Sequence, residues 1–97
     1  MAKKVFTVKI SEEDSKAVEK AWYEYSGARD IIAFIMQQKG VDWDILQEYV
    51  NVAEYRFTVC EMEKNRVATS YKPEEVDLSK YNYSFDFLEH SITFEEA

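Results

Sequence analysis

The sequence predicts an α+β domain: a long antiparallel helical hairpin that carries a small antiparallel β-sheet, in the order β-α-α-β-β, at its open end. Two long segments have apolar residues every three or four positions, which is the periodicity of amphipathic helices. Segments near both ends alternate between apolar and polar residues, as half-buried strands do. Because 97 residues can bury one modest core, we expect a single domain over residues 1–97.

The first expected elements are a strand over residues 5–10 and a helix over residues 12–39. The strand is β-branched and alternates between apolar and polar residues. Ser11 is a suitable N-cap, and three acidic residues follow it, where the positive end of the helix dipole favours them. We expect Gly40 to end this helix in a left-handed conformation.

The second half of the chain predicts another helix, over residues 43–71, followed by a connector over 72–80 and a β-hairpin over 81–95. Asp42 is a suitable N-cap for the helix. Pro73 disfavours helical geometry at the residue before it, so the helix should end by residue 71. The clearest alternation in the chain lies in the hairpin, at Tyr81, Tyr83, Phe85 and Phe87.

A two-stranded hairpin alone is marginal in water, so we expect the first strand to join it. The apolar face of the resulting sheet should cover the ends of the helices around Val18, Trp22, Val67 and Tyr71. In the rival arrangement, the strands extend away from the helices and pair with another molecule.

Charge and composition narrow the classes of partner. Twelve basic and nineteen acidic residues give a net charge of -7, and residues 72–97 carry two basic and seven acidic residues. A phosphate backbone would be repelled by this part, which argues against nucleic-acid binding. No apolar run approaches the roughly 20 residues that span a bilayer, and the start of the chain does not have the pattern of a signal peptide. We expect a cytoplasmic protein that does not bind membranes.

The residues that usually carry chemistry are scarce. His90 is the only histidine and falls in a predicted turn, where a solvent-exposed position is expected. Cys60 is the only cysteine, so no disulfide can form within the chain, and its place in a helical stripe predicts burial. No phosphate loop, metal-binding spacing or catalytic triad pattern is present in the sequence. The sequence therefore predicts no enzyme, no catalytic residue, no metal and no cofactor.

The two helices carry more large apolar residues near the closed end of the hairpin than one contact stripe per helix requires. We interpret the surplus as a contact surface for further copies of the chain or for a larger protein. The alternative is that the sheet folds along the hairpin and covers one extra side, or that the stripes are wide because the helices supercoil little. The residues that we predict to form the interface are Ile31, Phe34, Ile45, Val52, Tyr55 and Val59.

The chain also resembles a class of known proteins in the order of its elements. A short strand in MAKKVFTVKISEED, two long helices and a final alternating segment, YNYSFDFLEHSITFEE, look like small accessory proteins of tailed-phage virions. The resemblance implies a repeated part of a capsid or tail that is bound to a shell protein, and a location in the virion. It assigns no functional residue.

These observations favour a non-enzymatic structural or assembly protein that forms oligomers or binds a larger structural protein through the helical hairpin. One alternative is a peptide-binding adaptor that accepts an extended segment at a sheet edge, along the first strand or along Ser91 to Glu95. Another alternative is an acidic inhibitor that imitates the charge of nucleic acid, whose binding to a basic protein would depend steeply on salt.

Overall fold

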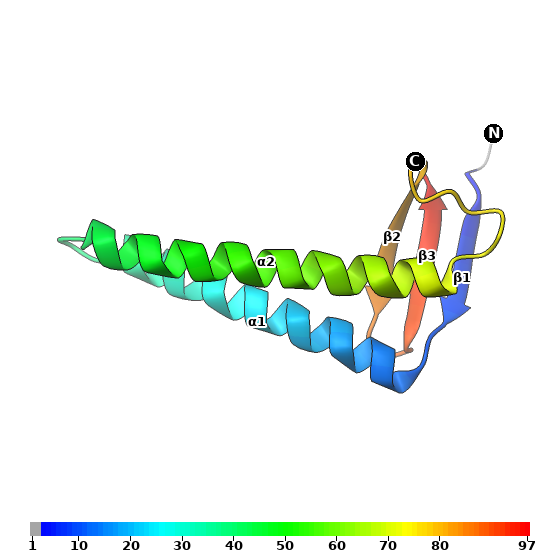
Figure 1. Ribbon diagram of the computed structural model, residues 1–97, viewed down its shortest axis with the longest axis horizontal. Helices are drawn as coiled ribbons and strands as arrows, with labels where there is room; N and C mark the ends of the chain where they lie inside the picture. Colours follow the sequence, from blue (N-terminus) through cyan, green and yellow to red (C-terminus); the bar gives the residue numbers. More distant parts are fainter. Residues whose placement is uncertain (1–2) are drawn as a thin grey trace.

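The computed structural model describes residues 3–97, and it confirms the α+β class and the order β-α-α-β-β. Two long helices lie side by side, and a three-stranded sheet stands at their open end (Figure 1). The molecule is elongated, with extents of 52 × 32 × 19 Å. The elements are β1 (Val5–Lys9), α1 (Glu12–Met36), α2 (Trp43–Tyr71), β2 (Tyr81–Asp86) and β3 (Ser91–Glu96).

Both predicted N-caps are confirmed. The Ser11 side chain accepts a hydrogen bond from the amide of Asp14 at 3.1 Å. The Asp42 carboxylate accepts from the amides of Asp44 and Ile45, at 3.0 and 3.3 Å. Each cap satisfies amides of the first helical turn that have no partner inside the helix, and this fixes where the helix begins.

The predicted end of the first helix, at residue 39, is wrong, because α1 ends at Met36. The amide of Gln37 donates to the carbonyl of Phe34 at 3.2 Å, which is a bond to the third residue back. Bonds of this kind tighten the last turn and close the helix early. Gly40 has the expected left-handed conformation, with φ of 71°, but it lies in the connection between the helices and not at the helix end.

The sheet has the order β1-β3-β2, with both neighbouring pairs antiparallel. All three strands therefore pair within the chain, and the rival arrangement is wrong. β3 lies in the centre, so Ser91 to Glu95 does not offer an edge; the free edges belong to β1 and β2. The strand limits also shift slightly, since β1 ends at Lys9 and β3 extends to Glu96.

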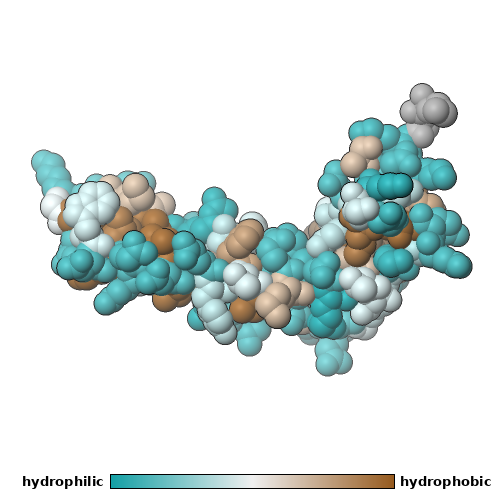
Figure 2. Space-filling model, turned by 45° about the horizontal axis from the view of Figure 1, so that its top comes forward, coloured by the Kyte–Doolittle hydropathy of each residue, from teal (hydrophilic) through white to brown (hydrophobic). Residues whose placement is uncertain are grey.

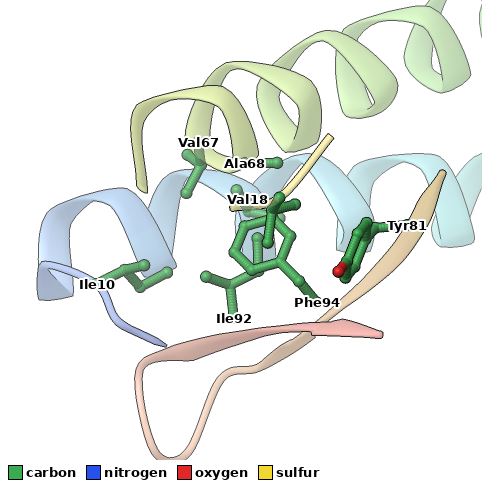
Figure 3. Packing of buried hydrophobic residues seen from close by; sticks show 8 residues of the cluster. Ile10, Val18, Val67, Ala68, Tyr81, Ile92 and Phe94 are labelled. Atoms are coloured by element: carbon green, nitrogen blue, oxygen red, sulfur yellow. The ribbon is translucent and has the colours of Figure 1, made fainter. Parts of the chain in front are cut away.

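The main core lies at the open end, between the sheet and the helices (Figure 3). Val18 of α1 and Val67 of α2 are buried against Ile92 and Phe94 of β3. The sheet therefore covers the helix ends as predicted, and Tyr71 packs at the margin of this core. Trp22 is the exception, because it remains 40% exposed. The buried residues of this core are Ile10, Val18, Val67, Ala68, Val76, Tyr81, Ile92 and Phe94.

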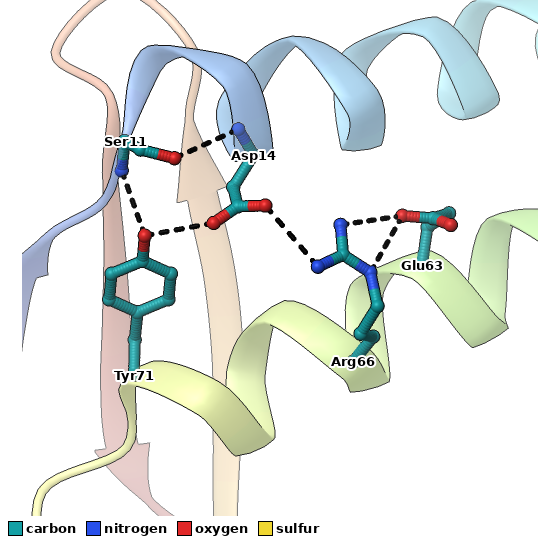
Figure 4. A network of polar contacts seen from close by, with 5 residues as sticks. All are labelled: Ser11, Asp14, Glu63, Arg66 and Tyr71. Atoms are coloured by element: carbon teal, nitrogen blue, oxygen red, sulfur yellow. Dashed lines mark hydrogen bonds and ion pairs between the residues drawn. The ribbon is translucent and has the colours of Figure 1, made fainter.

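A network of polar contacts joins the first turn of α1 to the last turns of α2 (Figure 4). The Tyr71 hydroxyl donates to Asp14 at 2.8 Å and accepts from the amide of Ser11 at 3.1 Å. Arg66 donates to Asp14 at 3.2 Å and to Glu63 at 2.9 Å. These contacts hold the two helices together where the chain enters and leaves the sheet.

His90 lies in the turn between β2 and β3, as predicted, but it is half-buried and not exposed. Its backbone has a φ of 48°, and its carbonyl accepts a hydrogen bond from the amide of Ile10 at 2.9 Å. This bond draws the turn against the end of β1. The side-chain Nδ1 is buried and has no hydrogen-bond partner within residues 3–97.

Candidate protein-interaction surface

The contact between the helices uses one row of side chains on α2. Leu46, Ala53, Cys60 and Val67 follow one another at intervals of seven residues, and all four are buried. An interval of seven is close to two helical turns, so the row keeps to one side of the helix. α1 contributes the small residues Ala21 and Ala28 to its buried positions, in addition to Ser15 and Val18. One row on each helix is thus enough to close the hairpin.

The predicted interface residues lie outside this contact. Five of the six, Ile31, Phe34, Ile45, Val52 and Tyr55, are 45% to 66% exposed. Val59 is half-buried. We call the surface formed by Ile31, Phe34, Ile45, Val52, Tyr55 and Val59 the free face.

The residues of the free face from the two helices lie on the same side of the hairpin. Glu24 and Arg56 form an ion pair of 2.7 Å, so they lie on one side of the hairpin and at about the same position along its long axis. We call two residues at the same position along this axis level. Ile31 lies seven residues after Glu24 on α1, and Tyr49 lies seven residues before Arg56 on α2. Both are therefore about two turns closer to the closed end. Ile31 and Tyr49 are therefore also level and on that side. Val52 lies three residues from Tyr49 and continues the same surface.

The sheet packs on the opposite side of the hairpin. Trp22 and Lys64 line a cavity of about 250 Å³ together with Phe85 and Phe87 next to the helices. Trp22 precedes Ile31 by nine residues, or 2.5 turns, so the two residues point in opposite directions from α1. The sheet therefore does not cover the free face, and the alternative in which the sheet covers the extra side is wrong. Apolar surface, in brown, gathers at the closed end of the hairpin (Figure 2).

The free face contains a hollow on α2. Ile45, Glu48, Tyr49 and Val52 line it, and its volume is about 420 Å³. These four residues have the spacing i, i+3, i+4 and i+7, which is the spacing of the hole that receives a side chain of the facing helix in coiled-coil packing. The hollow has the form of half of a helix-to-helix contact.

The candidate reactive group near the free face is the thiol of Cys60. Cys60 lies behind this face and is 2% exposed, and burial raises the pKa of its thiol, so the thiol stays protonated and unreactive at neutral pH. Among residues 3–97, no three His, Cys, Asp or Glu side chains are grouped so that they could hold a metal ion. No helix in this part of the chain is long and apolar enough to cross a membrane.

Sequence reasoning missed a second groove, on the other side of the hairpin. Tyr25 and Phe57 line it, with ring centroids 5.3 Å apart, and Arg29 lies over the Tyr25 ring at 5.6 Å. Its volume is about 460 Å³. Tyr25 and Phe57 belong to the apolar series, repeated every three or four positions, that predicts the two helices, so burial between the helices would be expected for them. The alanines in the sequence could have indicated this. Small residues at the centre of the helix-to-helix contact bring the helices close together, which leaves room for large rings only at the margin of the contact.

A third hollow, of about 860 Å³, follows the free edge of β2. Residues of α1 line one side, and residues of β2, of the turn after it and of β3 line the other; they are Glu12, Lys16, Glu19 and Tyr23, and residues 84–88, His90 and Thr93. The sequence did not predict this groove, because the position of β2 at the edge depends on the pairing of β1 with β3.

The whole chain was compared with models of protein families, with curated proteins and with solved structures, and nothing matched it.

Proposed function

We propose that this protein is a non-enzymatic assembly protein that binds copies of itself or a larger structural protein through the free face. The observation that carries the proposal is the position of five large apolar side chains, each 45% to 66% exposed, on the side of the hairpin that the sheet leaves open. Contiguous apolar surface of this kind usually marks a contact between proteins.

The energetics support an interface. Full burial of one large aliphatic or aromatic side chain contributes roughly 1.5 to 3 kcal/mol, so covering several half-exposed ones yields several kcal/mol. Within the hairpin itself this gain is not available, because the row of Leu46, Ala53, Cys60 and Val67 already occupies the contact with α1. A second protein can supply the missing cover. The resemblance to accessory proteins of tailed-phage virions suggests a capsid or tail as the assembly.

The proposal is tested by sedimentation velocity at micromolar concentrations on the wild-type chain and on Phe34→Asp and Val52→Asp. We expect the wild type to associate and each aspartate to weaken association about a hundredfold or more, because a carboxylate would be buried without a partner. Leu88→Asp is the matched control. Leu88 is 93% exposed in the turn after β2, far from the free face, and its substitution should leave association unchanged.

If the wild type is monomeric, a photo-crosslinking residue at position 34, expressed in the native host, tests binding to a larger protein. One larger protein should be crosslinked from position 34 and not from position 88, and Val52→Asp should abolish the product. The proposal is contradicted if all variants sediment as monomers and positions 34 and 88 give the same products.

A second candidate function is a peptide-binding adaptor, which the groove along the free edge of β2 favours. An extended segment could add to this edge by backbone hydrogen bonds while its side chains enter the groove. Such binding would slow amide exchange along β2 and leave the exchange of the helical hairpin unchanged. Slowing along the hairpin alone would exclude it.

A further inference from the structure

We infer that a second copy of the chain covers the free face, and that the two hairpins point in the same direction with α1 of each copy packed against α2 of the other. The inference rests on the proposed function and specifies its partner. The twofold axis of such a dimer is parallel to the helices, so residues that are level in one hairpin face each other across the interface.

Apolar residues then meet apolar residues at the closed end. Ile31 and Tyr49 each lie two turns from the Glu24–Arg56 ion pair toward the closed end, so we place them at the same position along the hairpin. Ile31 of one copy therefore meets the hollow of the second copy, with Phe34 one turn closer to the closed end. The hollow accepts a single large side chain in the manner of a knob in a hole, and its lining residues are Ile45, Glu48, Tyr49 and Val52.

Opposite charges meet where the apolar surface ends. The side chains of Glu24 and Arg56 are 38% and 40% exposed, so each is free to make a further contact on the outside of the hairpin. In the proposed dimer, Glu24 of each copy lies over Arg56 of the other. Four charges of alternating sign then surround the axis, and each charge has two partners of opposite sign.

The reversed arrangement, in which α2 packs on α2 of the second copy, lacks this match. Because the two hairpins then run in opposite directions, Glu24 of one copy does not lie over Arg56 of the other. In the arrangement that we propose, every pair of neighbouring helices is antiparallel, as in four-helix bundles of up-down topology. The two sheets lie on the outer sides of the bundle, because each sheet packs on the side opposite to the free face.

The experiment compares two charge variants, alone and mixed. Glu24→Arg leaves two positive residues in each copy, and Arg56→Glu leaves two negative ones. Each variant alone should dimerise about tenfold more weakly than the wild type, because like charges surround the axis. An equimolar mixture should recover the wild-type affinity as a heterodimer, measured by sedimentation with one variant fluorescently labelled. Circular dichroism confirms that each variant is folded.

The control is the ion pair between Glu12 and Lys16, which spans 2.7 Å and is highly exposed at the start of α1. Glu12→Arg and Lys16→Glu, alone or mixed, should leave dimerisation unchanged. If the charge variants fail to fold, Ile31→Cys in one chain and Tyr49→Cys in another give an independent test. The proposed packing predicts a disulfide between these two chains in an oxidised mixture, whereas the reversed packing predicts none.

The possible failures are distinguishable. If the mixture shows no recovery while Val52→Asp still abolishes association, the proposed packing is overturned and the assembly function stands. A wild type that remains monomeric also overturns the packing, and the crosslinking experiment at position 34 then decides the assembly function. Association that neither Val52→Asp nor Phe34→Asp weakens overturns both.

Discussion

At the scale of single residues, Asp14 shows how side-chain contacts at the open end depend on pH. The hydrogen bond from the Tyr71 hydroxyl is the main reason that the pKa of Asp14 lies below its ordinary value of 3.8, and contacts with Ser11 and Arg66 act in the same direction. A carboxylate with a lowered pKa in the folded state stabilises the fold at pH values above the unfolded pKa. This stabilisation is lost as the pH falls through the pKa of the folded state.

Tyr71→Phe should lower the free energy of unfolding by about 1 kcal/mol at neutral pH, because it removes the hydrogen bonds to Asp14 and Ser11. The difference between variant and wild type should narrow as the pH falls below 3.8 and Asp14 becomes protonated. Urea unfolding across this range measures it, with Tyr23→Phe, at an exposed tyrosine of α1, as the control. A difference that stays constant into acid would mean that the Asp14 contact contributes nothing.

Local signals predicted some residues better than others. The N-caps at Ser11 and Asp42 could be predicted because each depends only on amides a few residues away. The half-burial of His90 could not, because it depends on a contact between its turn and Ile10 at the other end of the chain. Within the free face, Val59 is less exposed than predicted.

At the scale of elements, α2 carries two rows of apolar residues with different tasks. The buried row that begins at Leu46 holds α1, and the row that begins at Ile45 has no cover among residues 3–97. Periodicity in the sequence revealed both rows and hence the helical hairpin. It could not reveal that β3 occupies the centre of the sheet, since strand order is decided by tertiary pairing and not by alternation within a strand.

Substitutions at the adjacent residues Ile45 and Leu46 should therefore affect different properties, association and stability. Leu46→Ala should lower the free energy of unfolding by about 2 kcal/mol. This is at the low end for a buried leucine, because Leu46 packs only between the two helices and not against the sheet. Ile45→Ala should change it by no more than about 0.5 kcal/mol but should weaken association. Urea unfolding and sedimentation of both variants separate the two effects. Equal losses of stability would contradict the division of α2 into a buried row and an exposed row.

At the scale of the whole molecule, the two ends differ in construction. The open end has a sheet, a core and a polar network, while the closed end consists of the two helices and their connection in the part of the chain that the structure describes. The element order in the sequence was sufficient to predict this division. Whether the sheet would lie along the hairpin depended on how its apolar face fits the helices, and the sequence left that alternative open. The structure places the sheet at the open end, on the side away from the free face.

The most direct test of the free face as the contact surface is amide hydrogen exchange of the wild-type chain at increasing protein concentration. Local opening governs exchange in such helices, and burial of the free face would suppress it. We predict slower exchange over residues 28–36 and 45–59, no change in β1 or β2, and loss of the effect in Val52→Asp. Slowing confined to β2, or slowing along the hairpin that persists in Val52→Asp, would contradict the account.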